Sequence, residues 1–290
     1  MLGTRLLLLS CVIIWGWTFV ATRICLEYIN QYELIGIRLL IGLPILLGII
    51  LAKKIRWTFG HKDLKYIIAG SSIIIAHFLI QATALKYTTA TNTGWIISMT
   101  PLITAVLAYL FLKERLGKGE IAGIIISTFG VLLLVSKGDF VNLDWLQSKG
   151  DWMILISVFT WAIYTITTRD LSRQHHPLIV TLVVFSPLLI VCLTYMLGTS
   201  AMTSFTSLPV KPIIALLFLG TLGTVAQWFW QEGVARLGAA KAGIFLYLEP
   251  VATTVLAVPL IADERFGFFT AIGGLLVLFG VWWASRTATK

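Results

Sequence analysis

The chain has little charge and no long polar segment. Only 12% of its 290 residues are charged, against 58% that are hydrophobic, and its mean hydropathy is +0.92. Soluble domains carry about 25% charged residues, so the composition excludes an ordinary soluble domain and indicates an integral membrane protein. The longest polar stretch, residues 136–151, is too short to be a separate catalytic domain.

Cysteines and catalytic motifs are also scarce. The chain has three cysteines, Cys11, Cys25 and Cys192, which lie in or at the ends of apolar runs without any motif spacing. We therefore expect neither a disulfide framework nor a metal site. The chain also has no HExxH, GxSxG, Walker or Asp-rich motif. We expect that it is not an enzyme, that it needs no cofactor and that ATP does not drive it directly.

What the chain does have is apolar runs of membrane-crossing length. A hydrocarbon core of about 30 Å needs roughly 17 to 25 such residues per helix. The runs do not alternate as barrel strands do, so an all-α membrane protein is predicted. Ten transmembrane helices are expected, at about 5–24, 34–52, 66–84, 93–112, 121–136, 152–168, 178–197, 212–231, 242–261 and 267–285. The first run has no small-residue cleavage pattern and is expected to stay in the mature protein.

A stretch late in the chain is a diverged copy of an earlier one. Residues 233–266 align with residues 84–116 when Pro250 is set on Pro101. Further matches on both sides extend the alignment, so the chain is predicted to consist of two diverged copies of one five-helix unit. The predicted divisions are a first repeat at 1–136, an external joint at 137–151 and a second repeat at 152–290.

The loop charges predict how the chain crosses the membrane. Most of the 22 lysines and arginines fall on the side of the N-terminus, which places both termini in the cytoplasm. Because five helices per repeat is an odd number, the second repeat enters from the opposite side and is inverted. Inverted repeats are a recurring construction of secondary transporters, so transport of a small solute is the leading hypothesis. The loop bias also accounts for the net charge of +9, and no nucleic-acid partner is expected.

Several motifs carry a resemblance to a known family. Two paired segments read TPLITAVLAYLFLKERL and EPVATTVLAVPLIADERF, and a glycine-rich run follows each. With the opening WGWTFVATR, Arg38 and the ALKYTTATNTG turn, the chain resembles the EamA-like ten-helix transporters of the drug/metabolite transporter superfamily over essentially its whole length. The resemblance implies a central cavity between two halves. It also implies export of amino acids, related small amphipathic metabolites or cationic drugs by alternating access, at a bacterial cell (inner) membrane.

Polar side chains within the apolar runs are the candidates for the cavity wall, because polar groups are expensive in hydrocarbon. Amides and hydroxyls among aromatic rings suit an amphipathic solute, whose apolar part or cation the rings would cover. The candidate substrate-binding residues are Trp15, Thr18, His77, Gln81, Trp95, Ser98, Trp161, Tyr164, Gln227, Gln231 and Tyr247. For each of them the alternative is an interhelical hydrogen bond or interface packing.

Glu249 is the sharpest single candidate, because it lies inside an apolar run directly before Pro250. Proline removes a backbone donor and would free carbonyl groups near the carboxylate. A carboxylate in that place could carry a proton, so Glu249, with His77, is the candidate for coupling transport to protons. The alternative is a structural acid that pairs with Arg38 or caps freed backbone groups.

Three charges are interpreted as structural. Arg38, in an apolar run, needs a partner or an aqueous face, and an ion pair is favoured over a substrate carboxylate. Glu114 and Glu264, each beside an arginine at a helix end, fit the N-terminal dipoles of the helices that follow them, 121–136 and 267–285.

Glycines in the fifth and tenth predicted helices stand at small-residue spacings. They are Gly119, Gly123, Gly130, Gly273 and Gly280. Such rows predict close helix packing within the chain, with a dimer contact as the alternative, so a monomer and a homodimer both stay open.

Two other functional classes also stay open. One is a membrane sensor, or an accessory subunit of a lipid-modifying system, that binds a solute without net transport, since the same fold would serve it. The other, an intramembrane enzyme, is disfavoured by the missing motifs.

Overall fold

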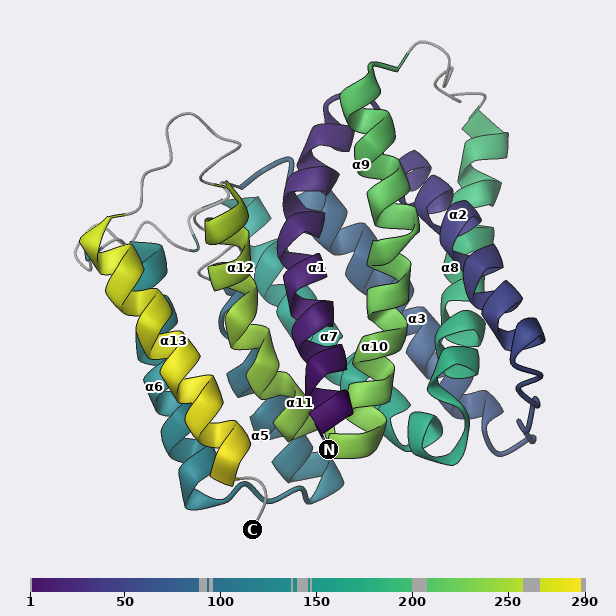
Figure 1. Ribbon diagram of the computed structural model, residues 1–290. Helices are drawn as coiled ribbons and strands as arrows, with labels where there is room; N and C mark the ends of the chain where they lie inside the picture. The colour runs from purple at the N-terminus through teal and green to yellow at the C-terminus, as the bar shows by residue number, and fades with distance from the viewer. Residues whose placement is uncertain are drawn as a thin grey trace.

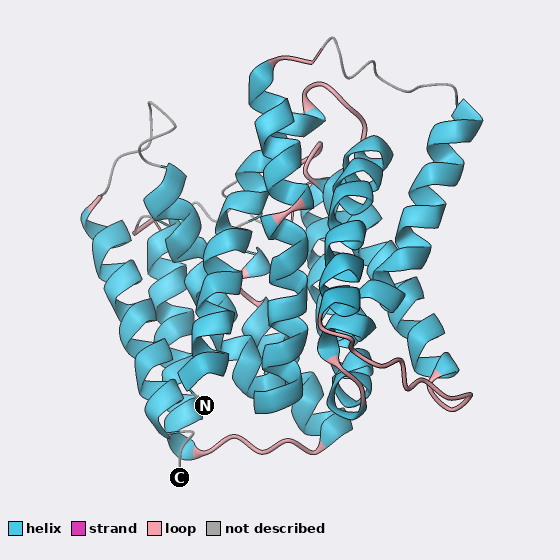
Figure 2. Ribbon diagram, turned by 45° about the vertical axis from the view of Figure 1, so that its right-hand side comes forward, coloured by secondary structure: helices cyan, strands magenta, loops and turns pink. Residues whose placement is uncertain are grey.

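The chain forms a bundle of helices. The computed structural model describes residues 2–88, 93, 96–136, 138, 139, 146, 148–199, 208–257 and 267–287. Among these residues all regular structure is helical (Figure 2). Both chain ends lie at one end of the bundle (Figure 1). We call this end, near Leu2 and Thr287, the termini face and the opposite end the far face.

The helices fall into two sets along the chain. The first set is α1 (Leu2–Leu26), α2 (Gln31–Ala52), α3 (Leu64–Ala84), α5 (Thr100–Leu112) and α6 (Lys118–Ser136). The second set is α7 (Lys149–Gln174), α8 (Pro177–Thr199), α9 (Val210–Gly220), α10 (Leu222–Leu237), α11 (Ala239–Ile244), the 3₁₀ turn η2 (Phe245–Tyr247), α12 (Leu248–Ala257) and α13 (Phe268–Thr287). Among the described residues, six helical segments are long and apolar enough to cross a membrane, with α9 and α10 counted as one.

Polar caps begin two of the long helices. The side chain of Asn30 accepts hydrogen bonds from the amides of Tyr32 and Glu33 at 2.9 and 3.0 Å, and Glu33 accepts one from the Asn30 amide. Ser148 and Asp151 exchange the same pair of bonds at the start of α7. These capping boxes satisfy amides that have no partner inside the helix, and so they fix where α2 and α7 begin.

Two predicted helices are interrupted. The run predicted at 212–231 is broken at Thr221, whose ψ of −84° departs from helical geometry, and it continues as α10. At this break α2 comes very close, because a Cβ atom on Gly42 would lie 2.6 Å from the Gly220 carbonyl oxygen. The run predicted at 242–261 begins at Ala239 and passes through α11 and η2 before α12 starts.

The two prolines of the repeated motif begin helices. Pro101 lies in the first turn of α5 and Pro250 in the first turn of α12. A proline there costs no intrahelical hydrogen bond, because amides of the first turn have no intrahelical acceptor. The helical ladder is disturbed beside Pro250, as expected, because the 3₁₀ turn η2 ends directly before Leu248. Glu249 therefore lies in the first turn of α12 and not inside one continuous helix.

The most extensive helix contacts are unchanged when the two sets are exchanged. α2 packs on α8, α5 on α11, and α6 on α13. α3 packs on α7 as α1 packs on α10, and α5 packs on α7 as α1 packs on α12. The correspondence pairs each helix of the first set with its equivalent in the second: α1 with α7, α2 with α8, α3 with α9–α10, α5 with α11–α12, and α6 with α13. When each helix is replaced by its equivalent, each of these contacts becomes either itself or another contact of the same group. Every one of these interfaces therefore joins the two sets.

Glycines bring α6 and α13 into close contact, to one side of the other helices (Figure 1). A Cβ atom on Gly123 would lie 2.5 Å from the Gly280 carbonyl oxygen, and one on Gly130 would lie 2.8 Å from that of Gly273. Larger residues would push the backbones apart, so these glycines serve packing within the chain, as predicted.

Candidate functional site

A cavity of about 70 Å³ lies among the central helices. Its wall combines aromatic rings, amides, hydroxyls and three ionisable side chains. The lining residues are Trp15, Thr18, Phe19, Arg38, His77, Phe78, Gln81, Ile97, Thr100, Ser157, Val158, Trp161, Gln227, Leu246 and Glu249. They come from α1, α2, α3, α5, α7, α10, η2 and α12, and from Ile97 just before α5. Both sets of helices thus contribute to the wall.

Three tryptophans meet at the side of the cavity that is nearer to the termini face. The ring of Trp15 lies edge-on to that of Trp161, with centroids 5.1 Å apart, and Trp230 lies 5.5 and 5.8 Å from the two. Aromatic pairs in this range attract each other beyond their burial of apolar area. We call Trp15, Trp161 and Trp230, from α1, α7 and α10, the tryptophan layer.

Arg38 lies on the cavity wall without an acidic partner among the described residues. Its Nη2 donates to the Gly223 carbonyl oxygen at 3.2 Å, and its guanidinium lies over the Phe78 ring, 5.1 Å from the centroid. Only 6% of the residue is exposed. The ion pair favoured for Arg38 is therefore wrong for the described part of the chain, and so is the alternative in which Glu249 pairs with Arg38. Backbone and ring contacts hold the cation in place and leave donors free for the cavity.

His77 is positioned by α7. Its Nδ1 lies 3.0 Å from the Ser157 carbonyl oxygen and 3.2 Å from the Thr160 hydroxyl. Because a carbonyl oxygen only accepts, Nδ1 carries a proton in the first of these bonds, which leaves Nε2 as an acceptor in the neutral ring. The ring also packs against Trp161, with centroids 5.1 Å apart.

Glu249 is 8% exposed and lines the cavity from the first turn of α12. The positive end of a helix dipole favours a carboxylate at this position. Thr253, one turn further along, has its hydroxyl within hydrogen-bond distance of the Glu249 and Gly16 carbonyl oxygens, at 2.9 and 3.0 Å. These contacts fix α12 against α1.

Most predicted binding residues gather at the cavity, and several do not. Its wall includes Trp15, Thr18, His77, Gln81, Trp161 and Gln227, together with Glu249 and Arg38. Tyr164, Gln231, Tyr247 and Ser98 are buried outside its wall. Trp95 and Glu264 lie outside the described residues.

Gln231 and Tyr164 bind each other. The Gln231 amide donates to the Tyr164 hydroxyl at 2.5 Å and to the Thr168 hydroxyl at 3.0 Å, and it accepts from Ser172 at 2.9 Å. The Tyr247 hydroxyl pairs with Thr128 of α6 at 2.6 Å. For these predicted residues the interhelical hydrogen bond, the alternative to solute binding, is what the structure contains.

Sequence reasoning missed Phe19, Phe78, Ile97, Val158 and Leu246, since apolar residues in an apolar run carry no signal. Two hydroxyl residues of the wall, Thr100 and Ser157, were not among the predicted binding residues either. Thr100 did carry a signal, because the repeat alignment sets it on Glu249, and both residues line the cavity.

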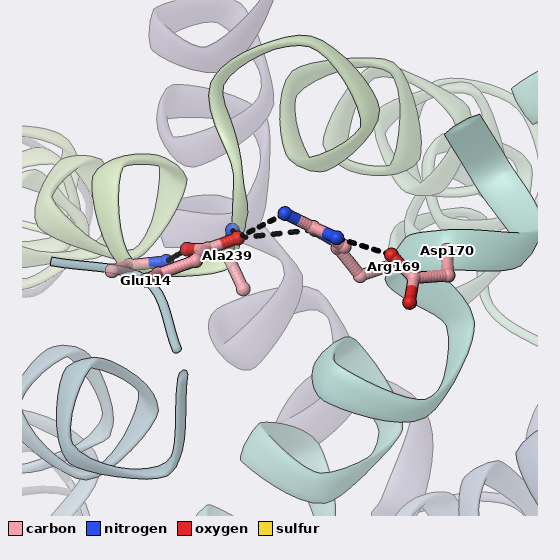
Figure 3. Close-up of polar contacts among 5 residues, drawn as sticks. Glu114, Arg169, Asp170 and Ala239 are labelled. Carbon is pink, nitrogen blue, oxygen red and sulfur yellow. Dashed lines mark hydrogen bonds and ion pairs between the residues drawn. The ribbon is translucent and has the colours of Figure 1, made fainter. Parts of the chain in front are cut away.

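Glu114 stabilises a different helix from the one predicted. Its carboxylate accepts hydrogen bonds from the amides of Ala239 and Ala240, at 3.2 and 3.0 Å, and pairs with Arg169 (Figure 3). It thus caps α11. The predicted place, at the start of α6, is taken by Glu120, which accepts from the Gly117 amide at 2.6 Å.

Two buried polar atoms of cavity-lining residues have no hydrogen-bond partner among the described residues. They are the Trp15 Nε1 donor and the Gln227 Oε1 acceptor. An unpaired buried polar group costs roughly 1–3 kcal/mol, so such groups in a cavity are suited to a ligand.

Comparison with known proteins identifies the class. Residues 3–136 and 148–286 each match the EamA-like transporter family. The chain therefore belongs to the EamA-like transporter family, as its motifs predicted.

Full-length relatives carry transporter names. An uncharacterized transporter of Archaeoglobus fulgidus is 28% identical over 284 residues, 96% of each chain. The uncharacterized transporter YyaM of Bacillus subtilis is 27% identical, over 98% of this chain and 94% of its own. A probable amino-acid metabolite efflux pump of Escherichia coli is 24% identical, over 95% and 92%. A solved crystal structure has the same fold, with a TM-score of 0.77 at 18% identity over 99% and 97%.

Proposed function

We propose that the protein is a secondary-active transporter that exports amino acids or related small amphipathic metabolites through the cavity between its two sets of helices. The observation that carries this proposal is the cavity wall itself, to which both sets contribute ionisable side chains and tryptophan rings. The efflux-pump name of the Escherichia coli relative supports the solute class.

Alternating access between two inverted repeats, 1–136 and 152–290, is the proposed mechanism. Two observations support this mechanism. The most extensive helix contacts are unchanged when the two sets are exchanged, and the two halves of the chain each match the same family. Transporters of this construction place their solute between the repeats and rock one against the other. We propose ten crossings of the cell (inner) membrane with both termini in the cytoplasm, in a monomer or homodimer.

The cavity suits a solute that carries both charges. Arg38 and the free Trp15 Nε1 offer donors to a carboxylate, while Glu249 and the free Gln227 Oε1 offer acceptors to an ammonium group. The tryptophan rings would cover an apolar side chain or the cation. Thr18, His77 and Gln81, also on the wall, complete the proposed binding set.

Glu249 is the proposed proton carrier, with His77 as its partner. A carboxyl group on the wall of a cavity can take up a proton when the solute leaves and release it at the other side. An imposed pH gradient should therefore drive solute flux in the parent protein.

Flux of amino acids through the purified protein in liposomes tests the proposal. Net movement of a solute is expected. A sensor or an accessory subunit would instead bind a solute, seen as a thermal shift, and move none of it; that result would refute transport.

A further inference from the structure

Along α7 the chain passes from the cavity to the termini face through successive contacts with the neighbouring helices. Ser157 and Trp161 line the cavity, and Trp161 belongs to the tryptophan layer. Further along the helix, Thr168 bonds to Gln231, and Arg169 then pairs with Glu114. These contacts follow the cavity along α7 in the direction of the termini face.

The last contact joins the two family matches. Glu114 lies in the turn between α5 and α6, in the first match, whereas Arg169 and the start of α11 belong to the second. The Glu114 carboxylate accepts a hydrogen bond from the Arg169 Nε atom at 3.1 Å, lies 3.0 Å from Nη2 of the same guanidinium, and accepts from two α11 amides (Figure 3). Both side chains are about 15% exposed. Four charge-assisted contacts on one carboxylate make a strong and well-oriented junction.

Gly238 makes room for this carboxylate. Its φ of +90° favours glycine, and a Cβ atom there would lie 2.7 Å from the Glu114 Oε1 atom. The chain can therefore turn from α10 into α11 with the first amides of α11 directed at Glu114.

A second ion pair between the two sets of helices lies close by. Lys241 of α11 pairs with Glu120 of α6 at 3.0 Å, and the Glu120 side chain is 3% exposed. Two carboxylates of the first match thus hold the first turn of α11. From there the chain runs through η2 directly to Leu246 and Glu249 on the cavity wall.

We propose that Glu114, Arg169 and the first amides of α11 form a latch that holds the termini face closed, and that this latch opens and recloses in every transport cycle. The inference rests on the proposed function. Because α11 continues into the segment that bears Glu249, the same movement that releases the latch displaces the cavity wall. Occupation of the cavity is thereby linked to opening of the termini face.

Cysteine accessibility tests the latch without a known solute. In a background without native cysteines, Val158→Cys places a reporter thiol on the cavity wall. A membrane-impermeant maleimide is then applied to vesicles of each orientation. In Glu114→Gln, labelling from the termini face is expected to rise about tenfold, because a hydrogen bond to a charged group contributes about one order of magnitude to a two-state equilibrium.

The matched control is Glu232→Gln, which removes an ion pair with Arg236 that lies within α10 on the same face of the bundle. Its labelling should stay within about twofold of the parent rate. Arg169→Gln keeps the hydrogen bonds from the α11 amides to Glu114, so its labelling rate should rise less than that of Glu114→Gln. If Glu114→Gln does not fold, Arg169→Gln serves as the test. Parent-rate labelling of both folded latch variants would overturn the latch. Raised labelling without any solute flux would show that these contacts close the termini face, but it would refute the proposed function and with it the opening of the latch in a transport cycle.

Discussion

Replacing Arg38 by glutamine distinguishes two possible roles of this cation, binding of the solute and stabilisation of the fold. The fold loses one hydrogen bond, to Gly223, and the contact with the Phe78 ring. Interhelical hydrogen bonds in membranes contribute about 0.6 to 1.7 kcal/mol, and a cation–π contact contributes roughly 0.5 to 2 kcal/mol. The stability loss should therefore stay at or below about 4 kcal/mol, since no ion pair among the described residues is broken.

The same replacement should also weaken the binding of a carboxylate solute. Hydrogen bonds to charged groups contribute roughly 1.5 to 3 kcal/mol, which converts to a rise of about ten- to 150-fold in the apparent KM. Flux into proteoliposomes measures it, with Arg38→Lys expected to be intermediate because it keeps the charge but not the planar fork. An amine analogue without the carboxylate should be carried equally by parent and variant. A lowered melting temperature with an unchanged KM for the carboxylate solute would refute the assignment.

Three further predictions address coupling, packing and a loop. Glu249→Gln should abolish the dependence of solute flux on an imposed pH gradient; flux that still follows the gradient would contradict proton carriage. Gly123→Leu should destabilise the protein by at least about 1–3 kcal/mol through overpacking, seen in thermal unfolding in detergent, whereas an unchanged midpoint would contradict the close packing. The Gly60 amide and His175 hold the pKa of Asp63 below its ordinary value. The Asp63 carboxylate anchors the loop before α3, because it accepts a hydrogen bond from the Gly60 amide at 2.7 Å and lies 3.2 Å from the His175 Nε2 atom. These contacts should persist above the ordinary carboxyl pKa and be lost as the pH falls through the lowered pKa of the folded state. Proteolysis of the loop at a series of pH values measures the loss, and Asp63→Asn should remove the pH dependence.

Composition and repeats predicted the class of the protein well, because hydrocarbon imposes its constraints on every residue of a crossing helix. They did not predict the break at Thr221 or the short elements α11 and η2. At the Thr221 break Gly42 of α2 lies close to the Gly220 carbonyl oxygen, a contact between residues distant in sequence that no local pattern records.

Polar side chains in the apolar runs indicated the cavity wall, but their polarity alone does not distinguish those that line the cavity from those that bond to each other. His77 and Gln227 face the cavity, whereas Gln231 and Tyr164 stand one or two turns away and satisfy each other. Periodicity places a side chain on a helix face without saying what lies opposite it. The same limit explains Glu114, whose helix-terminus chemistry was predicted but whose partner, α11, is distant in sequence.

Solute counterflow in proteoliposomes tests the central claim most directly. Liposomes that hold the purified protein are loaded with an unlabelled amino acid and diluted into a trace of the labelled form. The account predicts transient accumulation of label in parent liposomes, a strongly reduced signal with Arg38→Gln, and none in liposomes without protein. A panel of amino acids and related metabolites that shift the melting temperature yet give no counterflow would contradict it.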